Sequence, residues 1–234
     1  MIKSLPATTD ISEAFPLWIK QHTTSQSLVM DVGAGRGRIP GPSLIKPHIG
    51  HLVGVDPDPD IAHNPYLDEW YCATLEDFAH SSKNTFDVLY CIFVLEHVNH
   101  PEAFFAACRS LLKPGGMLFA VTPNLWHYFG LATTISARLG IQDWVLDRLI
   151  GRLAKEDYHF PTTYRANSVA AITRLLRLAG FASVEFCCFD NPISYQYIIP
   201  KSWHWCPRIY SWLMYRLRLP QFMGTIMFAT TAPR

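Results

Sequence analysis

The chain has 234 residues, of which 49% are hydrophobic, and a formal net charge of +1. Its length suits one domain with a sizeable core, while the near-neutral charge argues against proteins that bind nucleic acid through basic surfaces. No stretch is apolar over the roughly 18 residues that a membrane-spanning helix needs. The six cysteines include no C-x-x-C pair and the N-terminus shows no secretion signal, so we expect reduced thiols and a cytoplasmic location.

The N-terminal segment, 1–22, predicts an arm followed by a helix. Residues 1–10 have the composition of a polar arm. Residues 11–22 place Phe15 and Trp18 at helical spacing, which predicts a helix with one apolar face. Because Pro16 lacks the amide hydrogen that a helix interior uses, we expect the helix to be interrupted or kinked there.

A short buried strand and a glycine-rich turn follow at 28–37. The apolar residues of 28–32 are typical of a strand that is covered on both faces of a parallel sheet. The pattern D-x-G-x-G-x-G begins at Asp31, and bare glycine backbone lets a ligand lie against the peptide. A dinucleotide turn needs G-x-G-x-x-G, but Arg38 stands at the third glycine position, which disfavours a nicotinamide cofactor. The carboxylate of Asp31 suits a ligand that carries an ammonium group.

The next elements lead to a second acid at a strand end. Prolines limit the crossover helix to a short segment at 42–47. Residues 53–56 form a second strand that ends in Asp56, where a carboxylate can accept hydrogen bonds from both hydroxyls of a ribose. We expect Asp60 to cap a short helix and residues 69–73 to form the third strand.

The middle of the chain predicts two further strands and a helical segment. Residues 86–91 and 117–121 have the apolar runs of buried strands, and a helix separates them. Apolar residues at helical spacing then indicate helices at 131–139 and 145–153. The segment ends in a cluster of polar and titratable groups at 157–165.

The C-terminal part predicts a helix, two strands and an aromatic segment. Asn167 or Ser168 can cap the helix, and residues 181–189 and 223–231 form the strands. Between them, residues 191–221 mix tryptophans and tyrosines with arginines. This composition suits a helix packed on its own domain, the wall of an apolar pocket, or a membrane interface.

Five of these motifs together resemble the class I S-adenosylmethionine-dependent methyltransferases, in particular the small-molecule branch that includes quinone-biosynthesis methyltransferases. The resemblance covers roughly the first two thirds of the chain, with the motifs in the order and spacing of the family. The motifs are DVGAGRG at 31–37, VGVD at 53–56, FDVLYCIFVLEHV at 86–98, LLKPGGMLFAVTPN at 111–124 and LLRLAGF at 175–181.

The resemblance implies an α/β, Rossmann-like fold with a mostly parallel seven-stranded sheet, an antiparallel last strand, and helices on both faces. The last two strands form an antiparallel hairpin at the sheet edge in the family. We expect a single domain over 1–234, with a helical insertion at 125–165 as acceptor lid and an aromatic-rich insertion at 191–221. The helix at 11–22 either packs over the cofactor or only covers a sheet edge.

The cofactor that the resemblance implies is S-adenosylmethionine, with the glycine turn at its amino-acid end and Asp56 at its ribose. The family commonly has an acid at the position of Cys72, where it hydrogen-bonds the adenine amino group. Here the neighbouring backbone, Glu76 or Asp77 could substitute. The residues expected to bind the cofactor are Asp31, Gly33, Ala34, Gly35, Gly37, Asp56, Pro57, Ala73, Thr74, Leu75, Cys91, Ile92 and His97.

His159, His97 and Tyr164 are the candidate catalytic residues, with His159 or His97 as a general base if one is needed. His97 either faces the acceptor or has a structural role. Further candidates for substrate contact are Tyr158, His127 and Tyr128.

No metal site is expected, because one turn of chain around Glu96, His97 and His100 would have to supply every ligand. Arg36 and Arg38 stand beside the expected site of a cationic ligand. We therefore expect the side chains of both arginines to point to solvent.

The expected function is methyl transfer from S-adenosylmethionine to a hydrophobic or amphipathic small molecule by in-line displacement, with oxygen slightly favoured as the methylated atom. The alternative is a non-catalytic regulatory or scaffold protein that keeps the cofactor site. Expected partners are the small-molecule acceptor and, weakly, a membrane surface through 203–218; nucleic acid is not expected.

Overall fold

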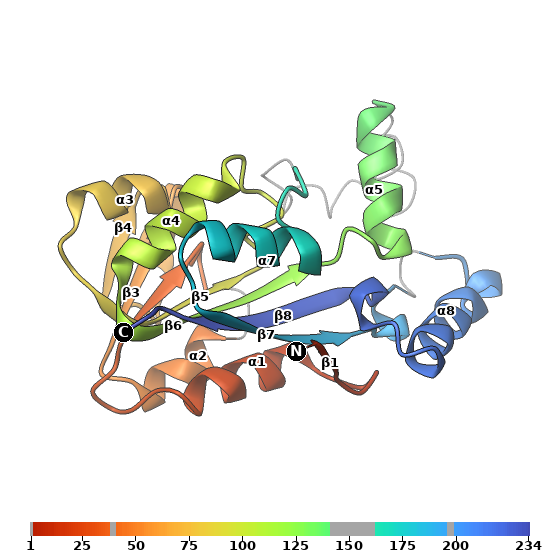
Figure 1. The fold of residues 1–234 in the computed structure, drawn as a ribbon, viewed down its shortest axis with the longest axis horizontal. Coiled ribbons are helices and arrows are strands. Elements are labelled where there is room, and N and C mark those ends of the chain that lie inside the picture. Colours follow the sequence, from red (N-terminus) through yellow and green to blue (C-terminus); the bar gives the residue numbers. More distant parts are fainter. Residues whose placement is uncertain (1, 38–40, 141–161, 196–198) are drawn as a thin grey trace.

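The computed structural model describes residues 2–37, 41–140, 162–195 and 199–234, which fold around one eight-stranded sheet (Figure 1). The order of the strands across the sheet is β1-β7-β8-β6-β5-β2-β3-β4. The strands are β1 (Ile2–Ser4), β2 (Leu28–Val32), β3 (His51–Asp56), β4 (Glu69–Cys72), β5 (Phe86–Ile92), β6 (Leu112–Pro123), β7 (Ser183–Phe189) and β8 (Thr225–Thr231).

The sheet is mostly parallel. Strand β8 pairs antiparallel with both β6 and β7, and the other neighbouring pairs are parallel. The predicted mostly parallel sheet with an antiparallel last strand is therefore confirmed. Because β7 runs in the same direction as β2, β3, β5 and β6, the carboxyl ends of these five strands lie along one edge of the sheet.

The N-terminal segment corrects the sequence prediction. Instead of a polar arm, Ile2–Ser4 forms β1, which pairs with β7 and adds an eighth strand to the seven expected. The amide of Leu5 donates to the carbonyl of Cys188, and Lys3 forms an ion pair with Glu185. These bonds join segments far apart in the chain, and β1 lacks any apolar alternation that would reveal them in the sequence. The β7–β8 pair is consequently flanked by β1 instead of lying at the edge.

Helices cover both faces of the sheet, as predicted (Figure 1). On one face, α1 (Ile11–Lys20) and α2 (Pro42–Ile45) bury Phe15, Ile19 and Ile45 against β2 and β5. On the other face, α3 (Leu75–Ser81), α4 (Pro101–Leu111) and α7 (Val169–Leu178) enclose the larger core. Two further helices, α5 (Tyr128–Arg138) and α8 (Trp205–Arg216), lie near one end of the sheet.

The helix boundaries follow the local chemistry. Asp10 caps α1, which continues through Pro16 without the expected interruption. Pro16 is buried, so we attribute the tolerance to packing of its ring, which offsets one missing amide hydrogen bond. The predicted cap at Ser168 is confirmed, because its side chain accepts from the amide of Ala171.

Two smaller expectations are corrected. Asp58, not Asp60, caps the 3-10 helix Pro59–His63, because its side chain accepts the hydrogen bond from the amide of Asp60. The third of the expected strands ends at Cys72, one residue before Ala73.

Several predicted features lie outside the described residues: the helix at 145–153, Tyr158, His159 and Arg38. Among the helices that the structure describes, none combines the length and the apolar character needed to cross a bilayer.

Candidate active site

A cleft of about 710 Å³ opens where the carboxyl ends of β2, β3 and β5 meet. Its walls come from these strand ends, from the start of α3 and from the loop between β5 and α4. Eight of the residues expected to bind the cofactor line it: Gly33, Asp56, Pro57, Ala73, Thr74, Leu75, Ile92 and His97.

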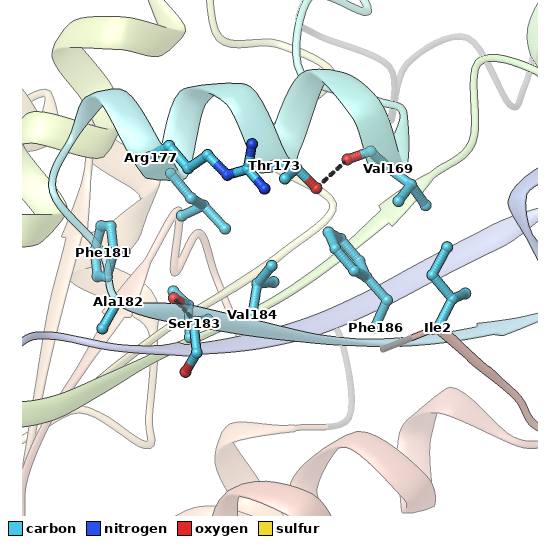
Figure 2. Close-up of a pocket in the computed structure, with 11 residues that line it drawn as sticks. Ile2, Val169, Thr173, Arg177, Phe181, Ala182, Ser183, Val184 and Phe186 are labelled. Carbon is cyan, nitrogen blue, oxygen red and sulfur yellow. Dashed lines mark hydrogen bonds between the residues drawn. The ribbon is translucent and has the colours of Figure 1, made fainter.

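A second cavity, of about 380 Å³, lies between α7 and β7, away from this cleft (Figure 2). Its wall includes Val169 and Arg177 of α7 and Val184 and Phe186 of β7, with Ile2 of β1 beside them. The described residues that line it include no carboxylate and no glycine turn. The strand-end cleft is therefore the candidate active site.

Asp56 connects the second strand end to the glycine turn. Its Oδ2 atom accepts a hydrogen bond from the amide of Gly35 at 2.9 Å, and Oδ1 accepts from the amide of Asp58 at 2.8 Å. Burial raises the pKa of Asp56, and these two amide bonds oppose the shift. Each oxygen keeps a further lone pair that can accept from a ligand.

The glycine turn is held close to the cleft wall. Gly33 has φ +74°, a conformation that favours glycine, and its amide donates to the carbonyl of Val55 at 2.8 Å. A Cβ atom at Gly33 would lie only 2.3 Å from Cγ2 of Val94. Glycine is thus required here by both backbone conformation and close approach.

Asn64 is a residue of this site that the sequence reasoning missed. Its Nδ2 atom donates to the carbonyls of Ala34 at 3.0 Å and Gly35 at 3.1 Å, and its Oδ1 accepts from the amide of Tyr66. The buried Asn64 side chain therefore holds the glycine turn in place through two of its carbonyls. The available signal was the Asn-Pro step at 64–65, which is typical of a local turn, but no local pattern shows which carbonyls the amide reaches.

Asp31 lies at the end of β2 as predicted and is almost fully buried. Burial raises the pKa of Asp31 to about 7; interaction with the Tyr90 hydroxyl opposes the shift, and the neighbouring charge of Asp56 adds to it. Burial and the same carboxylate raise the pKa of Tyr90 well above its ordinary value. The two acids thus form a site whose negative charge is costly until a cation arrives.

Cys72, where the resembled family commonly has an acid, lies at the end of β4 beside the cleft. The exposed Cys72 thiol donates to the carbonyl of Pro57 at 3.6 Å. Asp77 is engaged in capping α3, where its amide and its carboxylate both bond to Thr74. Glu76 lines the cleft, so of the two acids considered as substitutes it is the one that borders the ligand space.

The loop after β5 brings two candidate catalytic residues together. His97 lines the cleft. The amides of Thr163 and Tyr164 both donate to the carbonyl of Glu96, at 2.6 and 3.2 Å. A contact between two segments that are distant in the sequence thus places Tyr164 beside the loop that carries His97.

Glu96 itself points into a buried polar network. Its Oε2 atom accepts from the Thr122 hydroxyl at 3.2 Å, and Nδ2 of Asn167 donates to the same hydroxyl at 2.5 Å. Burial raises the pKa of Glu96 to about 7, with the Thr122 hydrogen bond opposing the shift. Two non-glycine residues of this region, Phe93 and Tyr164, have φ of 57° and 51°. Such left-handed backbone is strained and tends to occur at functional sites.

His127 and Tyr128 lie in a different cluster, at the start of α5. Nε2 of His127 is 3.1 Å from Oδ1 of Asp190, and both side chains are buried. The ring of His127 packs 4.0 Å from that of Tyr128 and 5.1 Å from that of Tyr210, measured between centroids. This cluster joins α5 to α8 and to the end of β7.

The remaining candidates differ in their surroundings. Cys91 is fully buried in the core, and Ala34 is buried in the turn. Gly37 has φ +72°, and a Cβ there would lie 2.7 Å from Oδ1 of Asn64. The Arg36 side chain is exposed, as expected, and its guanidinium lies 2.7 Å from a carboxylate oxygen of Asp60. The cleft thus has one strand-end acid in its wall, Asp56, and a second strand-end acid, Asp31, buried beside the lining residue Val32. With the glycine turn and the apolar walls, this combination suits a cationic nucleoside.

Comparison with known proteins points the same way. The model of a methyltransferase domain family matches residues 11–185. A ubiquinone biosynthesis O-methyltransferase of Neisseria meningitidis is 35% identical over 105 residues, which cover 41% of this chain and 44% of the relative. The mitochondrial ubiquinone biosynthesis O-methyltransferase of Mus musculus is 34% identical over 131 residues, covering 48% and 31%. The matches span less than half the length of these relatives.

Solved structures share the fold. A SAM dependent methyltransferase from Archaeoglobus fulgidus has a TM-score of 0.61 at 14% identity, over 94% of both chains. Phosphoethanolamine N-methyltransferase 2 of Haemonchus contortus, in complex with phosphomonomethylethanolamine and S-adenosylhomocysteine, has a TM-score of 0.60 at 12% identity. That match covers 95% of this chain and 53% of the other.

Proposed function

The chain belongs to the class I S-adenosylmethionine-dependent methyltransferase family, and we propose that it transfers a methyl group from S-adenosylmethionine to a hydrophobic or amphipathic small molecule. The observation that carries the proposal is the hydrogen bond from Gly35 to Asp56, which joins the glycine turn to the second acid beside the cleft. Oxygen is the favoured methyl acceptor, because the relatives of 34–35% identity are named ubiquinone biosynthesis O-methyltransferases.

The residues of the cleft fit the methyl donor. S-Adenosylmethionine, when bound, supplies a methyl group that is activated by the positive charge on sulfur. Asp56 accepts hydrogen bonds from the ribose hydroxyls with its remaining lone pairs, and the Asp31 carboxylate balances the ammonium group. Ala73, Thr74 and Leu75, which line the cleft beside β4, border the base.

The acceptor approaches from the side of the loop after β5. His97 and Tyr164, with His159, hold or remove the proton of an acceptor hydroxyl. Fixing the geometry of the two reactants contributes up to about 7–11 kcal/mol to lowering the barrier. A positioned base adds about 10²–10⁴-fold where the acceptor must lose a proton. Positioning is therefore the larger contribution expected of this protein.

In this proposal, residues 1–234 act as one catalytic domain in the cytoplasm. Residues 125–165 serve as the acceptor lid, and residues 191–221 are a second, aromatic-rich insertion. The ring of Tyr210 in that insertion packs against the rings of His127 and Tyr128. A hydrophobic acceptor partitions into lipid, so the proposal includes weak contact of 203–218 with a membrane surface.

Calorimetric titration with S-adenosylmethionine, S-adenosylhomocysteine and NADH tests the cofactor. We expect micromolar binding of the two sulfur nucleosides and no response to NADH; the opposite result overturns the assignment. Turnover is then tested by mass spectrometry with phenols and catechols that carry apolar chains. Tight binding of S-adenosylmethionine without methylation of any acceptor in a broad screen would instead support the alternative of a non-catalytic regulatory or scaffold protein.

A further inference from the structure

Helix α8 carries its large apolar side chains on the outside of the molecule. Trp205, Ile209 and Trp212 follow one another at spacings of four and three residues, which places them on one helix face. Their side chains are 59%, 49% and 61% exposed. Leu213 and the neighbouring Trp203 add to this exposed surface. A surface helix normally shows the reverse orientation, with its apolar stripe toward the core.

The opposite face of α8 is fixed to the protein. Pro207 and Ser211 are buried, and the Ser211 hydroxyl donates to the carbonyl of Asp190 at 3.4 Å. The hydroxyl of Tyr210 donates to the carbonyl of Phe222 at 2.7 Å, and that of Tyr215 to the carbonyl of Leu5 at 2.7 Å. Because these bonds hold the polar face inward, rotation of the helix to bury its tryptophans would break them.

The charged side chains of residues 191–234 are all basic. Lys201, Arg208, Arg216 and Arg218 are exposed on or beside α8. The sequence from 191 to 234 contains no aspartate or glutamate. A symmetric contact between two copies through this face would bring arginines toward arginines without an acid of the segment to offset them. The exposed lysine and arginines on and beside α8 therefore favour a negatively charged binding partner.

The position of α8 relates this face to the candidate active site. The helix lies in the connection between the end of β7 and the start of β8. The end of β7 is on the same edge of the sheet as the ends of β2, β3 and β5, which form the cleft. In Figure 1, α8 stands at the end of the molecule beyond β7 and β8, near α5.

We propose that the outer face of α8, formed by Trp203, Trp205, Ile209 and Trp212 with Arg208 and Arg216, docks on an anionic phospholipid bilayer. The tryptophans enter the headgroup region, where amphipathic rings are favoured, and the arginines contact the lipid phosphates. Docking through this face would turn the acceptor-binding edge of the sheet toward the lipid phase from which a hydrophobic acceptor comes. Only this consequence rests on the proposed function.

Flotation with vesicles tests the proposal on the full chain. We expect binding to phosphatidylcholine vesicles that contain phosphatidylglycerol, a decrease with added salt, and at least about tenfold weaker binding to pure phosphatidylcholine. The double variant W205S/W212S should lose about tenfold or more in binding, and R208Q/R216Q should lose most of the preference for phosphatidylglycerol. Trp70→Ser changes an exposed tryptophan of β4 instead and should bind like the wild type.

Two further measurements keep a negative result interpretable. Circular dichroism and calorimetric titration with S-adenosylmethionine should be unchanged in both double variants, which separates loss of docking from loss of the fold or of the proposed function. Failure of the folded wild type to bind either vesicle overturns the proposal. So does concentration-dependent dimerisation that W205S/W212S abolishes, because the face would then be an interface between copies.

Discussion

The amide of Gly35 donates a hydrogen bond of 2.9 Å to Oδ2 of Asp56. The carboxylate proposed to bind the ribose therefore also shapes the glycine turn proposed to hold the amino-acid end of the methyl donor. One side chain thus connects the second strand end to the glycine turn, so its loss should remove the proposed ligand contacts and loosen the turn at the same time.

Asp56→Asn should weaken the binding of S-adenosylmethionine by about 10- to 100-fold, because hydrogen bonds to a charged group contribute about 1.5–3 kcal/mol each. Calorimetric titration measures the effect. Asp60→Asn is the matched control: Asp60 lies in the following 3-10 helix, outside the cleft lining, and should change the affinity less than threefold, as roughly expected of a surface ion pair. Equal affinities of wild type and Asp56→Asn would exclude the ribose role.

Binding of the methyl donor should depend on pH through Asp31, whose pKa burial raises to about 7. Below that pH the free protein holds a proton on Asp31, which must leave before the carboxylate can balance an ammonium group. Affinity should therefore fall by up to about tenfold per pH unit between about pH 7 and 5.5, where the donor's own amino group stays protonated. Titrations in buffers of different ionisation enthalpy should show proton release.

Asp31→Asn should bind weakly at all these pH values and release no proton. Asp10→Asn provides the control, because hydrogen bonds from Ser12 lower the pKa of Asp10 and it stays ionised throughout this range. An affinity of the wild type that does not vary with pH would show that Asp31 takes no part in binding.

The strand-end acids could be predicted because short-range patterns determine them. An apolar run that ends in an acid is sufficient to place Asp31 and Asp56 at the same edge of a parallel sheet, and the glycines after Asp31 mark the turn. The short α2 follows equally directly from its prolines. What these predictions share is that their cause lies within a few residues of the element itself.

The features that the sequence did not reveal depend on long-range contacts. Strand β1, at the start of the chain, pairs with β7, which follows about 180 residues later in the sequence. Tyr164 is placed by the carbonyl of Glu96, which belongs to a distant segment. Asn64 reaches across to the carbonyls of the glycine turn. The outward orientation of α8 likewise depends on hydrogen bonds to Asp190 and Leu5. None of these partners is visible in a local pattern.

Glu96→Gln should change how stability depends on pH. Burial raises the pKa of Glu96 from 4.5 to about 7. Between these pH values the folded state keeps a proton that the unfolded state has lost, so the free energy of unfolding falls as pH rises. The variant should lack this contribution, on the order of 3 kcal/mol, and be more stable than the wild type at pH 8. Urea unfolding at pH 5 and pH 8 measures it.

Glu102→Gln is the control for this prediction. Glu102 is exposed and paired with Arg174 at 3.3 Å; because such surface pairs contribute less than about 1 kcal/mol, its pH profile should match that of the wild type. A Glu96→Gln variant that is less stable at pH 8 than the wild type would mean that the ionised carboxylate is stabilising in its network with Thr122.

Asn64→Ala should loosen the glycine turn. It leaves the carbonyls of Ala34 and Gly35 and the amide of Tyr66 without their partner. We expect a loss of about 2–4 kcal/mol in the free energy of unfolding and a KM for the methyl donor that rises more than kcat falls. Asn84→Ala, at an exposed asparagine, should alter neither. An unchanged KM would show that the turn keeps its shape without this clamp.

Gly33→Ala separates the two reasons for glycine at the cleft. Gly33 and Gly180 have similar φ, +74° and +81°, but only at Gly33 does a Cβ meet a neighbour, 2.3 Å from Cγ2 of Val94. Gly180→Ala should therefore lose about 1–2 kcal/mol for the backbone conformation alone, and Gly33→Ala about 1–3 kcal/mol more for overpacking. In the G33A/V94A double variant, that excess should disappear, because the clashing methyl group is gone. Urea unfolding of the three variants, with V94A alone as reference, measures these differences. If Gly33→Ala is no less stable than Gly180→Ala, the wall of the cleft yields to the added methyl group, and Gly33 is then required for its φ and not for close approach.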